Sequence, residues 1–74
     1  MDPHRRDHLK RHLEQAERHI AEGQRHIAKQ MAIVAELERD GHDSKSSKEL
    51  LAILHKTLQM HKDHRESILR ELQG

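Results

Sequence analysis

The apolar residues of this chain recur at alternating steps of three and four positions, in two long stretches separated by a short polar segment. This spacing keeps one stripe of a helix against a neighbouring helix, and we call the stripe the hairpin seam. The first stretch places on the seam Leu9, Leu13, Ala16, Ile20, Gly23, Ile27, Gln30, Val34 and Leu37. The second places there Leu51, Leu54, Leu58, His61, Arg65, Ile68 and Leu72. The pattern predicts two amphipathic helices.

Capping residues mark the ends of the first helix. Asp2 can accept hydrogen bonds from the free backbone N–H groups of a first turn, and Pro3 suits the first helical position. Gly41 is typical of the residue that ends a helix in the left-handed backbone conformation. We therefore predict a first helix over residues 3–40 and a turn over 41–43.

Two caps compete for the start of the second helix. Asp43 or Ser44 can cap it directly after the turn, and the segment 46–49, Ser-Ser-Lys-Glu, has the spacing of a capping box. We predict a second helix over residues 44–73, so that residues 1–74 form a single domain.

A linker this short makes the two helices antiparallel neighbours. With so short a turn, the residue numbers of two seam positions that face each other across the hairpin add to about 84 or 85. In this register Val34 lies opposite Leu51, and Gly23 lies opposite His61. The sequence predicts an all-α fold, an antiparallel two-helix hairpin.

The composition makes a lone hairpin marginal. The chain has no aromatic residue and no cysteine, so its core is aliphatic and carries no disulfide. Chains of this size often reach stability by oligomerising. Apolar residues beside the seam suggest an interface for a second copy, namely Met31, Ile33, Leu50, Ile53, Met60 and Leu69. We expect a homodimeric four-helix bundle, with a monomeric hairpin as the alternative.

Histidine is the residue type that could carry chemistry. An Arg-His-aliphatic triplet recurs every seven residues and sets His12, His19 and His26 in a row beside the seam. Such a row can simply cover apolar atoms at the edge of a helix interface. Protonation of several histidines in mild acid could also loosen an assembly.

Metal binding is the other interpretation of the histidines. In the predicted register, the metal candidates are His19, His26, His61 and His64. Imidazoles with a nearby carboxylate suit Zn²⁺, Ni²⁺ or Cu²⁺. The alternative to a purely structural role is therefore a histidine-based divalent metal-binding protein. Apart from such a metal, we expect no cofactor.

Charge and composition argue against several other functions. Fourteen Lys and Arg against thirteen Asp and Glu give a net charge of +1, which favours neither nucleic acid nor membrane. Because the first helix is longer, we expect residues 3–12 to project beyond the second as a basic overhang, with Arg5, Arg6, Lys10 and Arg11. This overhang could contact phosphate backbones or an acidic protein, or simply be a solvated helix end. No cysteine nucleophile and no long apolar run is present, so we expect neither an enzyme nor a membrane protein, and a cytoplasmic location.

Three segments resemble a family of short uncharacterised helical proteins of alphaproteobacteria. They read HLEQAERHIAEG over 12–23, LERDGHD over 37–43 and LQMHKDHR over 58–65. The start of the second helix departs from the pattern, because residues 44–48 read SKSSK where relatives are acidic or alanine-rich. The resemblance implies a bacterial cytoplasmic protein and carries no assigned activity. From the residues themselves, we expect a small oligomeric interaction or scaffold protein that binds another protein.

Overall fold

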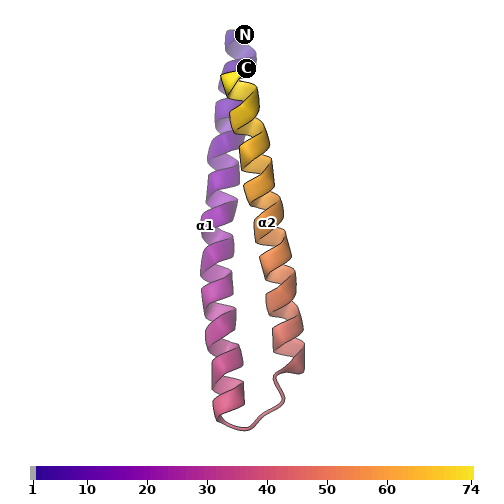
Figure 1. Cartoon of the computed structure of the whole chain (residues 1–74). Coiled ribbons are helices and arrows are strands. Elements are labelled where there is room, and N and C mark those ends of the chain that lie inside the picture. Colours follow the sequence, from indigo (N-terminus) through magenta and orange to yellow (C-terminus); the bar gives the residue numbers. More distant parts are fainter. Residues whose placement is uncertain (1) are drawn as a thin grey trace.

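A computed structural model describes residues 2–74 and consists of two helices, α1 (Pro3–Arg39) and α2 (Lys45–Gln73). The helices run antiparallel, with both ends of the chain at the same end of the molecule (Figure 1). The molecule is a rod with extents of 58 × 14 × 13 Å. The predicted all-α hairpin is confirmed. Within residues 2–74, neither helix has the length and apolar character needed to cross a membrane.

The two ends of α1 are held by the contacts that its capping residues favour. The Asp2 carboxylate accepts a hydrogen bond of 3.1 Å from the His4 backbone N–H. At the other end Gly41 has a φ of 73°, and the His42 N–H donates to the Leu37 carbonyl at 2.8 Å. The first bond satisfies a backbone N–H group, and the second a carbonyl group, that a helix end leaves free. The helix ends at Arg39, one residue before the expected end.

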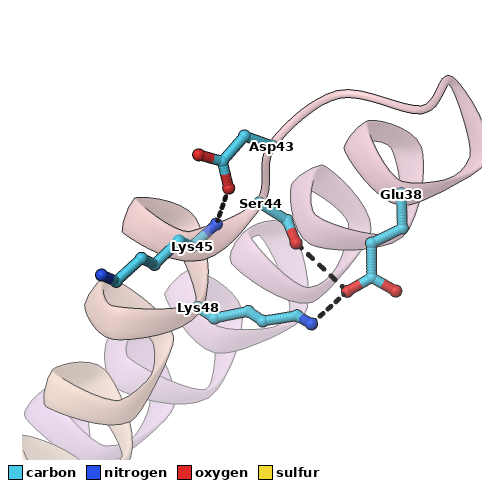
Figure 2. A network of polar contacts seen from close by, with 5 residues as sticks. All are labelled: Glu38, Asp43, Ser44, Lys45 and Lys48. Atoms are coloured by element: carbon cyan, nitrogen blue, oxygen red, sulfur yellow. Dashed lines mark hydrogen bonds and ion pairs between the residues drawn. The ribbon is translucent and has the colours of Figure 1, made fainter.

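The start of α2 is tied to the end of α1 by polar side chains (Figure 2). Ser44 is the N-cap residue of α2 and makes no side-chain cap bond, while Asp43 before it accepts a bond of 3.0 Å from the Lys45 N–H. Because α2 begins at Lys45, the 46–49 segment lies inside the helix. Glu38 of α1 accepts a hydrogen bond from Ser44 at 3.3 Å and pairs with Lys48 at 2.7 Å. The hydrogen bond and the positive charge of Lys48, with a smaller contribution from Ser44, hold the pKa of Glu38 below its ordinary value.

The core lies along the predicted seam and consists of two apolar clusters. The cluster nearer the chain ends contains Leu9, Ala16 and Ile68, with Leu13 and Leu72 packed against it. The cluster nearer the turn contains Ile20, Ile27 and Leu58, with Leu51 and Leu54 packed against it. Half-buried His61 and Arg65 come between the α2 members of the two clusters. Beyond the second cluster Val34 is buried and Leu37 half-buried.

The expected pairing of Gly23 with His61 is wrong in detail. A Cβ built on Gly23 would lie 3.3 Å from the Leu58 Cδ1 atom, so Gly23 faces Leu58. The His61 ring lies instead against the His19 ring. The physical reason is that a seam side chain inserts between residues of the facing helix and does not meet one partner head on. A single sum of residue numbers therefore fixes the register only to within about one helical turn.

Gln30, a polar residue on the seam, is buried and has a specific partner. Its side-chain nitrogen donates a hydrogen bond of 3.0 Å to the Ser47 backbone carbonyl in the first turn of α2. A buried amide without a partner is unfavourable. This bond therefore favours one alignment of the helices near the turn.

Candidate functional site

A hollow of about 170 Å³ lies where α1 and α2 bring two histidines together. The His19 and His61 ring centroids are 4.8 Å apart, with the ring planes tilted by 52°. Both residues are half-buried. The hollow is also lined by Glu22, Gly23, His26, Leu54, Thr57 and Leu58. We call it the histidine hollow.

The heptad repeat explains why α1 supplies several polar groups to this hollow. His19 and His26 are seven residues apart, which is close to two full helical turns, so they share one face of α1. Glu22 follows His19 by three residues and is its neighbour on that face. Leu54 and Leu58 of α2 contribute apolar surface. The hollow thus combines imidazoles and a carboxylate with a partly apolar lining.

The four metal candidates do not all meet. His19, His26 and His61 line the hollow, whereas His64 is exposed and is absent from its lining. As their side chains stand, no three His, Asp or Glu residues within 2–74 form a group that could hold a metal ion. Glu22, the carboxylate that lies between His19 and His26 in the sequence, also lines the hollow. Its signal in the sequence is the three-residue spacing from His19, which places both on one helical face.

A second histidine pair lies apart from the hollow. The His8 and His12 ring centroids are 4.2 Å apart, and both residues belong to α1. Both are exposed. The His8–His12 pair is therefore a control for the His19–His61 pair, whose two members come from different helices.

An adjoining hollow of about 300 Å³ lies nearer the turn. It is lined by His26, Lys29, Gln30, Ile33, Leu50 and Leu54. Because His26 and Leu54 line both hollows, the two are neighbouring parts of one groove between the helices. Ile33 and Leu50 stand on this groove side and are exposed by 37% and 45%.

The six interface candidates fall on two opposite sides of the hairpin. Ile53 follows Leu50 by three residues, and Met60 follows Thr57 of the histidine hollow by three, so both lie towards the groove side. We call Ile33, Leu50, Ile53 and Met60 the groove-side row. Met31 precedes Ile33 by two residues and so points about 200° away around α1. Leu69 follows Met60 by nine residues, about half a turn around α2.

The basic overhang is shorter than expected. Leu9 is buried against Ile68, and the Arg5 guanidinium pairs with Glu71 at 3.2 Å. The α1 residues around them therefore lie beside the end of α2. Arg6, Lys10 and Arg11 are exposed, and none of them forms an ion pair with another described residue.

Comparison with known protein families, with curated proteins and with solved structures found no match to this chain. The resemblance to the alphaproteobacterial proteins therefore stays a prediction.

Proposed function

We propose that this protein is a homo-oligomeric helical scaffold whose activity is binding rather than catalysis. Two hairpins associate through the groove-side row and form a four-helix bundle. The observation that carries the proposal is the exposure of that row, where Ile53 is 58% and Met60 69% exposed. Contiguous exposed apolar side chains on a small protein favour association with a partner.

The exposed area of the hairpin supports a second copy as the partner. A compact protein of 8.7 kDa exposes about 4,700 Å². The hairpin exposes 5766 Å², an excess of about 1,000 Å². A standard interface hides about 800 Å² on each partner. Association of two hairpins would therefore bring the exposed area per chain close to that of a compact protein.

The groove also offers a place for side chains of a second copy. The hollow between Ile33 and Leu50 has a volume of about 300 Å³, which exceeds that of one aliphatic side chain. In helical bundles, a side chain of one helix inserts between four residues of the facing helix. A partner's copy of Ile53 or Met60 fits this role, and a two-fold axis repeats the contact.

Sedimentation equilibrium of paired variants tests the proposal. The wild-type chain is expected to sediment as a dimer at micromolar concentrations. Ile53→Glu is expected to weaken dimerisation at least tenfold, because a carboxylate would be buried in the interface. Met31→Glu is the matched control, since Met31 is 54% exposed on the opposite side of the hairpin.

A wild-type chain that stays monomeric at millimolar concentration would overturn the proposal. Equal weakening by both glutamate variants would place the interface elsewhere and overturn the assignment to the groove-side row. We also propose a cytoplasmic location, as the sequence led us to expect. Fractionation of the native cells followed by immunodetection tests that location.

A further inference from the structure

We propose that the histidine hollow is a binding site for a divalent transition-metal ion of the Zn²⁺ type. His19 of α1 and His61 of α2 supply two imidazole nitrogens, and the Glu22 carboxylate supplies a third ligand. This site would join the two helices of one hairpin, so it goes beyond the proposed association of two hairpins.

The two imidazoles are already neighbours across the helices. Their centroids are 4.8 Å apart and their planes are tilted by 52°, so the rings are not stacked face to face. Zn²⁺ holds histidine nitrogens at about 2.0–2.1 Å, which needs both rings to turn one nitrogen towards a shared point. The hollow beside the rings has a volume of about 170 Å³ and leaves room for an ion and a water molecule.

Glu22 is the group best placed to complete the site. It lines the hollow and follows His19 by three residues on the same helical face. Among the described residues it forms no ion pair and no side-chain hydrogen bond, so no such contact has to break before it rotates. A histidine–histidine–carboxylate set with an open fourth position is a common zinc environment.

The positive charges near the hollow do not occupy it. Arg18 and Arg25 are exposed residues of α1, and Arg65 follows His61 by one helical turn. Arg65 pairs with Glu66 at 3.2 Å. None of these guanidinium groups lines the hollow. The apolar surface of Leu54 and Leu58 limits competition from water for the ligands.

Because the ligands come from both helices, the ion would stabilise the folded hairpin. A ligand that binds the folded state alone raises its stability in proportion to the logarithm of ligand concentration over Kd. The His8–His12 pair belongs wholly to α1 and can bind an ion without joining the helices. This difference separates the proposed site from incidental uptake of metal by exposed histidines.

Thermal melts and titration calorimetry of the full chain with ZnCl₂ at pH 7.5 test the site. We use His8→Gln as the background, because it removes one member of the exposed pair. One Zn²⁺ per chain is expected to bind with a Kd of micromolar or below. At a hundredfold excess over Kd it should raise Tm by about 10–20 °C.

Three further substitutions in that background identify the ligands. His61→Gln and His19→Gln are each expected to weaken binding at least tenfold and to abolish the rise in Tm. Glu22→Gln changes an exposed residue and should keep the fold while weakening binding. His64→Gln is the control and should leave both measurements unchanged, since His64 lies outside the hollow.

Several results would overturn the site. One is the absence of Zn²⁺ binding in the His8→Gln background. Another is Zn²⁺ binding that His61→Gln leaves intact, and a third is binding that His64→Gln also removes. Sedimentation with and without Zn²⁺ separates this proposal from the dimer. If Zn²⁺ raised Tm only by causing chains to associate, seen as an increase in sedimenting mass, a site within one hairpin would also be contradicted.

Discussion

Glu38 shows how one side chain can stabilise the turn of this hairpin. It receives a hydrogen bond from Ser44 and pairs with Lys48, so a single carboxylate joins the last turn of α1 to the beginning of α2. The carboxylate is partly exposed, so solvent screens the pair and its contribution is modest. Its main effect is to favour one position of the α2 start relative to α1.

The lowered pKa of Glu38 makes part of the stability depend on pH. Lys48 is the main cause of the shift. A carboxyl group with a lower pKa in the folded state stabilises the fold above its unfolded pKa. This contribution is lost as pH falls through the folded pKa. Melts of Glu38→Gln and wild type between pH 7 and 3 should therefore differ at pH 7 and converge in acid.

Glu36→Gln is the control for this pH dependence. Glu36 is an exposed residue of α1, like Glu38, and forms no ion pair with a described residue. Its substitution should leave the difference between pH 7 and pH 3 as in wild type. A constant difference between Glu38→Gln and wild type over the whole range would show that the carboxylate charge contributes nothing.

At the scale of the elements, the end of α1 depends on the backbone of Gly41. Its φ of 73° lies in the left-handed region, which is unfavourable for a residue with a Cβ. Gly41→Ala should lower the free energy of unfolding by about 1–2 kcal/mol, measured by urea denaturation. Gly41→Asn should lower it less, because asparagine tolerates this conformation better. Equal effects of the two substitutions would contradict this explanation.

The sequence predicted the elements and their faces well and their side-chain contacts less well. Steps of three and four placed buried residues such as Ile20, Ile27 and Ile68 on the seam, because burial of one stripe is what that period reflects. The short turn then required antiparallel helices. The contact of Gly23 with Leu58 was missed, since periodicity gives faces but not how side chains interdigitate.

The candidate site illustrates the same limit. Heptad spacing placed His19 and His26 on one face, and the hairpin brought His61 to them. It also suggested His64, which is exposed and does not line the hollow. The interface candidates were identified by hydrophobicity alone. Only the placement of both helices separates Met31 and Leu69 from the groove-side row.

At the scale of the whole molecule, the rod has little interior for its surface. Its core contains seven buried apolar residues among residues 2–74, and none of them is aromatic. If two copies associate as proposed, the folded state gains stability by mass action. The Tm of the wild-type chain should then rise with protein concentration between about 1 and 100 μM. Ile53→Glu should show a smaller rise of Tm over the same concentration range.

Because the core is divided into two clusters, the two ends of the hairpin differ in their resistance to local unfolding. His61 and Arg65 come between the α2 members of the clusters, and the Arg65 Nε is buried without a hydrogen-bond partner among the described residues. The part near the chain ends can therefore unfold locally while the part near the turn stays folded. The short loop holds the two helices close together there. Amide hydrogens near both chain ends then exchange with solvent before those flanking the loop. Local unfolding of the hairpin therefore begins at the chain ends, opposite the loop.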